Sequence, residues 1–184
     1  METGRRRWVD KAGWGDGPWQ REDDFVAMVD DATGLPCFLC RNDLGCWCGY
    51  VGLMEGHPWF EKPRGFVSAL VDVHGGVSFS AGSVVEPGPD PEPGAEPTLS
   101  DEIARAAPAG RVWWIGFDCC HGGDKAPAFA ALFDVSAPDL PEELAAMIPA
   151  LRRLLQTSYR DQAYATAMVL FLAAQAAEAG GLAQ

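Results

Sequence analysis

The stretch FVAMVDDATGLPCFLCRNDLGCWCGYVGL (residues 25–53) determines the fold that we expect. It contains three short apolar runs, residues 25–29, 37–41 and 46–53, separated by segments rich in Asp, Asn, Gly and Pro. These residue types favour turns, because Gly tolerates positive φ, Pro presets φ and Asn or Asp can bond to the nearby backbone. Short apolar runs between such turns are typical of an antiparallel β-meander.

Further strands are expected downstream of this meander. Residues 66–73 and 77–81 flank His74-Gly75-Gly76, and the two glycines suit a tight hairpin because they accommodate positive φ. Residues 111–117 are rich in Val, Ile and Trp, which are residue types enriched in strands. The pattern therefore predicts a mostly antiparallel sheet of five to six strands.

The C-terminal third has the pattern of two helices. Asp139 can cap the first, and Pro149 is expected to kink it. The second is expected from about residue 158 to residue 178, before Gly180-Gly181. A sheet followed by two C-terminal helices places the chain in the α+β class.

The 184 residues suit a single domain with two irregular parts. Residues 1–24 are rich in Gly, Trp and charge, so we expect an irregular N-terminal arm before a single α+β domain over residues 25–184. Residues 84–100 include an acidic run with alternate prolines. Such a run cannot form a strand ladder or bury apolar surface, so it is expected to be a disordered loop.

Charge and motif content exclude several classes of function. The chain has 14 Lys and Arg against 26 Asp and Glu, a net charge of −12, which disfavours binding to nucleic acid or to anionic membranes. No run reaches the roughly 18 apolar residues of a membrane span, and residues 5–10 lack the pattern of a signal peptide, so we expect a cytoplasmic protein. P-loop, dinucleotide-binding, zinc-protease and serine-hydrolase motifs are missing from the sequence.

Four cysteines could form a zinc site. Cys37 and Cys40 are followed by Cys46 and Cys48, and four thiolates can bind zinc tetrahedrally. However, Cys37 and Cys40 fall on opposite faces of a regular strand, and the spacing of the second pair differs from that of usual zinc knuckles. The alternative is that these cysteines are small buried core residues.

A second candidate site follows the strand at residues 111–117. Cys119 or Cys120 could act as a nucleophile with a histidine as its base, and Cys119, His121 and Asp124 are the catalytic candidates. The same residue types could instead hold a metal, with zinc as a candidate cofactor, or bind a polar ligand. In a further alternative, Asp118 and Asp124 only cap the turn at Gly122-Gly123.

The three histidines extend this second candidate site. His74 and His121 both precede a Gly-Gly pair after a strand-like run, so they could converge at one edge of the sheet. Asp72 would share a face with His74 and orient its ring. The other candidate ligand-binding residues are His57 and two possible stacking surfaces, Trp59 and Trp113.

Several longer motifs resemble a group of small phage and prophage proteins. The motifs that carry the resemblance are Gly34-Leu35-Pro36-Cys37, Cys48-Gly49-Tyr50-Val51-Gly52, Gly56-His57-Pro58, Val73-His74-Gly75-Gly76, Trp113-Trp114-x-Gly116-Phe117-Asp118-Cys119-x-His121-x-Gly123-Asp124 and Tyr159-Arg160-Asp161-x-x-Tyr164. The resemblance implies an accessory protein that acts on host physiology, and it implies no particular activity.

Three functional hypotheses follow. The first is a phage-type accessory protein that binds a small polar ligand, such as a nucleotide signal in an anti-defence role. The second is a Cys/His or metal-dependent hydrolase or transferase. The third is an acidic inhibitor that binds a basic host protein, and it rests on the net charge of −12.

Overall fold

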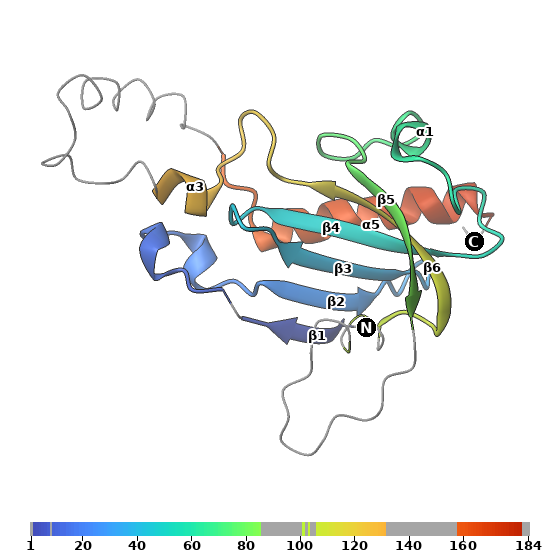
Figure 1. The fold of residues 1–184 in the computed structure, drawn as a ribbon, viewed down its shortest axis with the longest axis horizontal. Helices are drawn as coiled ribbons and strands as arrows, with labels where there is room; N and C mark the ends of the chain where they lie inside the picture. The colour runs from blue at the N-terminus through green and yellow to red at the C-terminus, as the bar shows by residue number, and fades with distance from the viewer. Residues whose placement is uncertain are drawn as a thin grey trace, which may run out of the picture.

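The computed structural model describes residues 2–7, 9–85, 101, 103, 106–131 and 158–181. Six strands form one antiparallel sheet in the order β1-β2-β3-β4-β6-β5 (Figure 1). The strands are β1 (Glu2–Arg6), β2 (Phe25–Val29), β3 (Pro36–Arg41), β4 (Trp47–Met54), β5 (Phe79–Val85) and β6 (Gly110–Asp118). The helices are α1 (Arg64–Ser68), α3 (Pro127–Ala131) and α5 (Gln162–Ala179), with 3-10 turns η1 (Ala12–Trp14) and η2 (Pro18–Gln20).

Helix α5 covers one face of the sheet and forms the main core with it. It runs along β4, behind the sheet in the view of Figure 1. Small residues such as Ala165 and Ala173 are fully buried on α5, so the helix can approach the strands closely. The Asp161 carboxylate caps the helix by accepting a hydrogen bond of 2.8 Å from the Tyr164 backbone N–H.

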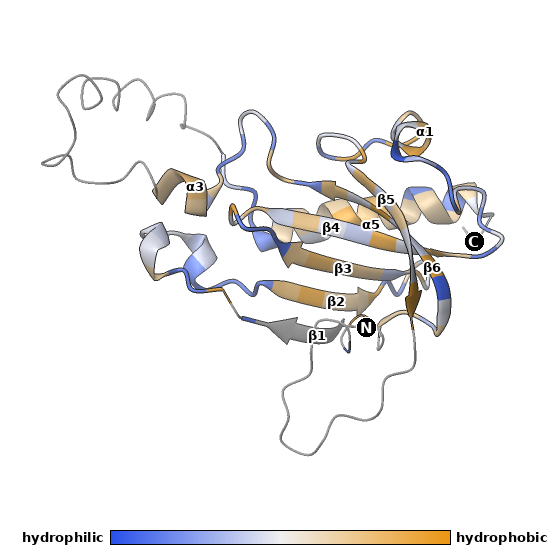
Figure 2. Ribbon diagram, viewed as in Figure 1, coloured by the Kyte–Doolittle hydropathy of each residue, from blue (hydrophilic) through white to orange (hydrophobic). Residues whose placement is uncertain are grey.

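The opposite face of the sheet has smaller aromatic clusters. Phe38 and Tyr50 stack with ring centroids 4.5 Å apart, and Phe25 and Trp114 pack against the same Phe38 ring. Apolar residues therefore lie on both faces of the central strands, and Figure 2 shows β2 and β3 as largely hydrophobic.

The predicted α+β class is confirmed. The meander predicted for residues 25–53 is formed by β2, β3 and β4, and each of these strands pairs antiparallel with the next. The strand predicted at residues 111–117 is β6. The second predicted helix is confirmed as α5, although it begins at Gln162, a few residues later than expected. The first predicted C-terminal helix, with Asp139 and Pro149, lies outside the described residues.

The predicted hairpin at His74-Gly75-Gly76 is wrong. Gly75 and Gly76 do have positive φ, but residues 64–68 form α1 and β5 pairs with β6. The apolar residues of this segment, Val67, Val73 and Val77, are buried in the main core with α5. Packing against a helix thus replaces the strand ladder that the apolar pattern suggested.

The N-terminal arm is only partly irregular. Residues 2–6, expected within the irregular segment 1–24, form β1, which pairs with β2 and covers an edge that would otherwise be unpaired. Of the segment 84–100, expected to be disordered, residues 84 and 85 belong to β5. Residues 86–100 lie outside the part of the chain that the structure describes.

Candidate functional site

Two histidines and an aspartate from two separate loops meet at the start of α5. His74 lies on the loop between α1 and β5, and His121 and Asp124 lie on the loop after β6. His74 Nε2 is 2.7 Å from Asp124 Oδ2, and His74 Nδ1 is 2.9 Å from the Tyr164 hydroxyl on α5. We refer to His74, His121 and Asp124 as the His–His–Asp cluster.

The loop after β6 is fixed by its own backbone. The Asp124 N–H donates to the His121 carbonyl at 2.9 Å, and the His121 N–H donates to the Asp124 carboxylate at 3.0 Å. The Ser158 N–H donates to the Gly123 carbonyl at 2.9 Å, which joins this loop to the segment that leads into α5. The loop that carries His121 and Asp124 is therefore held by backbone bonds as well as by side chains.

The hydrogen bonds of the cluster orient the His74 ring and hold the Asp124 carboxylate. In a neutral His74 ring whose Nε2–H donates to the Asp124 carboxylate, Nδ1 accepts from the Tyr164 O–H. Arg160 Nε donates to the other carboxylate oxygen at 2.9 Å. Burial raises the pKa of Asp124, but the hydrogen bonds from His74, Arg160 and the His121 N–H outweigh it and hold this pKa below its ordinary value. The cluster thus contains a carboxylate, 2 % exposed, that is kept ionised.

His121 presents a ring nitrogen to two nearby carboxylates. Its Nδ1 is buried and has no hydrogen-bond partner among the described residues, and it lies 3.7 Å from Asp118 Oδ1 and 3.9 Å from Asp124 Oδ2. The His121 and His74 rings meet edge to face at 5.4 Å between centroids. Ligand atoms of His74, His121 and Asp124 all lie within 4.8 Å of one another, and no other group of His, Cys, Asp and Glu in the described ranges is so placed.

Gly75 makes room for the His121 ring. Its φ is 67°, and a Cβ at this position would overlap the ring. Gly56 has a similar φ of 92° but faces open space. The two glycines therefore separate the effect of backbone conformation from that of contact with His121.

Gly75→Ala is expected to lower the free energy of unfolding more than Gly56→Ala does. Both substitutions would force an alanine into a positive φ, at a cost of about 1–3 kcal/mol. Only the methyl group added by Gly75→Ala would also displace His121, which adds about 1–3 kcal/mol. Urea unfolding, monitored by tryptophan fluorescence, gives the free energy of unfolding of both variants. Equal losses would show that the position of the His121 ring does not depend on Gly75.

The structure places His57 and Trp59, two predicted ligand-binding residues, away from the cluster. His57 Nε2 bonds to the Ala176 carbonyl at 2.9 Å, and its Nδ1 accepts from the Trp59 N–H at 3.0 Å. Ala176 is twelve residues along α5 from Tyr164, or about 18 Å. His57 thus ties the loop after β4 to the end of α5, and Trp59 is buried in the main core.

Asp72 and Trp113 make contacts outside the His–His–Asp cluster. The backbone of Asp72 bonds to the Gln175 side-chain amide at 2.8 and 3.0 Å, and the ring of His74 is oriented by Asp124 and Tyr164 instead. Trp113 donates from its indole N–H to Ser80 Oγ at 2.9 Å on the β5–β6 side of the sheet.

Asp118 does lie near the cluster, as predicted. Its Oδ1 is 3.7 Å from His121 Nδ1. The same oxygen accepts from the Cys120 N–H at 3.1 Å, so Asp118 also caps the turn that follows β6. Both readings of this aspartate, as a neighbour of His121 and as a cap, agree with its position.

Cys119 is a core residue and is poorly suited to act as a nucleophile. It is 1 % exposed and packs in the main core. Burial, followed by the Asp124 charge, raises its pKa to about 12. Because the thiolate is the nucleophile, a thiol that stays protonated at neutral pH disfavours the predicted Cys119–His121 pair.

The alternative zinc set of Cys37, Cys40, Cys46 and Cys48 is not brought together. Cys37 packs in the main core, and Cys40 packs on the opposite face of the sheet, in the cluster that contains Phe25 and Phe38. Cys46 contacts Cys120 instead, with 3.0 Å between the sulfur atoms. The opposite facing of Cys37 and Cys40, expected from strand periodicity, is the physical reason.

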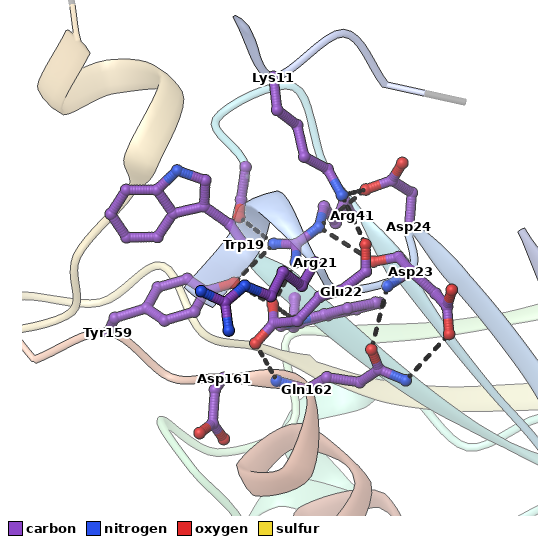
Figure 3. A network of polar contacts seen from close by, with 12 residues as sticks. Lys11, Trp19, Arg21, Glu22, Asp23, Asp24, Arg41, Tyr159, Asp161 and Gln162 are labelled. Carbon is purple, nitrogen blue, oxygen red and sulfur yellow. Dashed lines mark hydrogen bonds and ion pairs between the residues drawn. The ribbon is translucent and has the colours of Figure 1, made fainter. Parts of the chain in front are cut away.

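A buried polar network near the start of α5 was not predicted. Arg41, on β3, donates to Asp24 at 2.9 Å, to Tyr159 at 2.8 Å and to Glu22 (Figure 3). Its guanidinium lies over the Trp47 ring, 4.3 Å from the ring centroid. Lys11 forms a further ion pair of 2.6 Å with Asp24. The signal that could have indicated it is a charged residue at the end of the apolar run of β3.

This network fixes the start of α5. Glu22 accepts from the Tyr159 hydroxyl at 2.5 Å and from the Gln162 backbone N–H at 3.1 Å (Figure 3). Arg160 and Tyr164, which bond to the cluster, lie within and just beyond this anchored segment. Both residues belong to the motif Tyr159-Arg160-Asp161-x-x-Tyr164, to which the sequence alone assigned no role.

Comparison with known proteins does not assign a function to this site. Neither family models nor curated proteins nor solved structures gave a match to the chain. Among the described residues, no helix combines the length and the apolar character that crossing a membrane requires.

Proposed function

We propose that the chain binds a divalent transition-metal ion, with zinc as the best candidate, through the His–His–Asp cluster. The observation that carries the proposal is the buried His121 Nδ1, which lacks a partner in the described structure and faces the Asp124 carboxylate. Imidazole nitrogen and carboxylate oxygen are ligands that zinc prefers.

The surroundings of the cluster supply the outer contacts that such a site needs. In the arrangement described above, a proton joins His74 Nε2 to Asp124. A metal ion would take the place of this proton, and His74 would then carry its proton on Nδ1 and donate it to the Tyr164 hydroxyl. Arg160 holds the second oxygen of Asp124, so the carboxylate stays oriented when His74 is released.

A small anionic ligand is the best candidate for the remaining coordination position. Three protein ligands leave one position of a tetrahedral ion open. The His121 side chain is 37 % exposed, so solvent reaches this side of the cluster, and the Arg160 charge beside it favours an anion. This supports the predicted small polar ligand, with a phosphate or nucleotide as its chemical class.

Metal-dependent hydrolysis or group transfer is the second candidate function. Three protein ligands with one open position are also the arrangement of catalytic zinc sites, in which the ion activates a water molecule. The acidic-inhibitor hypothesis and the phage-type accessory role stay predictions.

Zinc titration of chelator-treated protein tests the proposal. We expect one zinc ion per chain by calorimetry and by native mass spectrometry. His121→Ala is expected to weaken zinc binding by about 100-fold or more, because loss of even an outer-shell partner costs about 10–100-fold.

His57→Gln provides the matched control. His57 is the remaining one of the three histidines and lies outside the cluster. Glutamine can keep the bond to the Ala176 carbonyl. This variant is expected to bind zinc as the unmodified protein does. Unchanged affinity in His121→Ala, or equal losses in both variants, would contradict the proposed site.

A further inference from the structure

Two cysteines from distant parts of the chain face each other close to the cluster. Cys46 lies just before β4 and Cys120 just after β6, and their sulfur atoms are 3.0 Å apart. Cys46 is buried and Cys120 is partly exposed. Both are free thiols in the structure.

The ends of β4 and β6 bring these two residues together. Cys48 pairs with Asp118 at the end of the ladder, and beyond it the Cys119 N–H donates to the Trp47 carbonyl at 2.8 Å. Cys46 and Cys120 each lie one residue beyond this bond. Neighbours across two strands have Cβ atoms about 4.5–5.5 Å apart, close to the separation that a disulfide needs, and the contact between the two sulfur atoms agrees with such a placement.

We propose that Cys46 and Cys120 are a redox-active pair that a small-molecule disulfide, such as oxidised glutathione, converts into an intramolecular disulfide. This proposal does not depend on the metal site. It assigns the sulfur contact a chemical role that the buried thiols Cys37 and Cys119 do not share, because no second sulfur is placed against them at such a distance in the described residues.

The exchange proceeds in two balanced steps. Cys120, the accessible partner, loses its proton to solvent and attacks one sulfur of the glutathione disulfide, which gives a mixed disulfide and releases one glutathione thiol. Cys46 then loses its proton, attacks the Cys120 sulfur, forms the Cys46–Cys120 bond and releases the second glutathione. Two protein thiols are oxidised, and one glutathione disulfide is reduced to two thiols.

Burial agrees with this order of attack. Burial, with the neighbouring Cys120 sulfur next, raises the pKa of Cys46, so the more exposed Cys120 is the thiol that reacts first. Once the mixed disulfide has formed, Cys46 is already within contact distance of the sulfur that it must attack. The bond would also anchor Cys120, the neighbour of His121, to the turn before β4.

Cys40 and Cys48 provide a matched control pair. They are also direct cross-strand partners, on β3 and β4. Variants with serine at both of these positions keep Cys46 and Cys120 unchanged.

The test is oxidation of the fully reduced protein by glutathione disulfide, acid quenching, and trapping of the remaining thiols with a maleimide. We expect four maleimide adducts on the six cysteines and a peptide that links Cys46 to Cys120. The Cys40→Ser/Cys48→Ser variant is expected to lose the same two thiols. Cys46→Ser is expected to stop at the mixed disulfide, with glutathione retained on Cys120.

Three outcomes would overturn the proposal. They are retention of all six thiols, a disulfide that joins any other pair, and a stable glutathione adduct on Cys120 of the unmodified chain. The measurement on the unmodified chain is sufficient by itself, so it holds even if a serine variant does not fold.

Discussion

Arg41→Met is expected to lower the free energy of unfolding by about 3–5 kcal/mol, the usual cost of breaking a buried ion pair. The Arg41 side chain is 0 % exposed, as is its partner Asp24. Methionine fills part of the same volume but removes a cation that, together with Lys11, faces the buried Asp24 charge. It also removes the bonds to Glu22 and Tyr159, so the start of α5 loses part of its anchor.

Arg111→Met is the matched control for this loss. Arg111 also pairs with two carboxylates, Glu55 and Glu61, but its side chain is 55 % exposed. Exposed ion pairs contribute about 0–1 kcal/mol, so this variant is expected to stay close to the unmodified chain. Urea unfolding, monitored by circular dichroism, gives the free energy of unfolding of both variants. A loss below about 1 kcal/mol in Arg41→Met would refute the structural role of the network.

Asp124→Asn is expected to weaken zinc binding by about 100-fold or more and also to lower stability. The carboxylate has three partners in the structure: His74, Arg160 and the His121 backbone N–H. Asparagine keeps the shape and one acceptor oxygen, but it lacks the charge that holds Arg160 and that a metal would require. Each charged hydrogen bond that is lost is expected to lower the free energy of unfolding by about 1.5–3 kcal/mol.

Asp118→Asn, at the end of β6 directly before the loop that carries Asp124, is the control. Asp118 is partly exposed, and its Oδ1 accepts from the Cys120 N–H, which an asparagine oxygen can also do. We expect a smaller loss of zinc affinity in this variant than in Asp124→Asn, because Asp118 is not one of the three proposed ligands. Calorimetry on the two folded variants compares them. Similar affinities would mean that Asp124 is not a ligand.

The sequence could predict that the two histidines converge, but it could not predict which residues form hydrogen bonds with them. The shared His-Gly-Gly context indicated that His74 and His121 could converge, and the structure brings their rings together. The hairpin expected to place His74 does not form, so the two loops meet through packing with α5 instead. Tyr164 lies 90 residues from His74, and no local pattern relates two residues so far apart.

Residues 25–53 by themselves determined the antiparallel meander, because strand period and turn chemistry depend on neighbours in the chain. The Asp161 cap and the glycines after residue 179 likewise mark the ends of α5 locally. Only the tertiary structure decided that Arg41 is buried beside Asp24 and that Cys46 faces Cys120. The first contact depends on the pairing of β2 with β3, because Phe25 pairs with Cys40 and the Arg41 N–H donates to the Asp24 carbonyl. The second contact depends on the pairing of β4 with β6. Both registers arise from the burial of apolar surface across the sheet, which has no signature in any short segment.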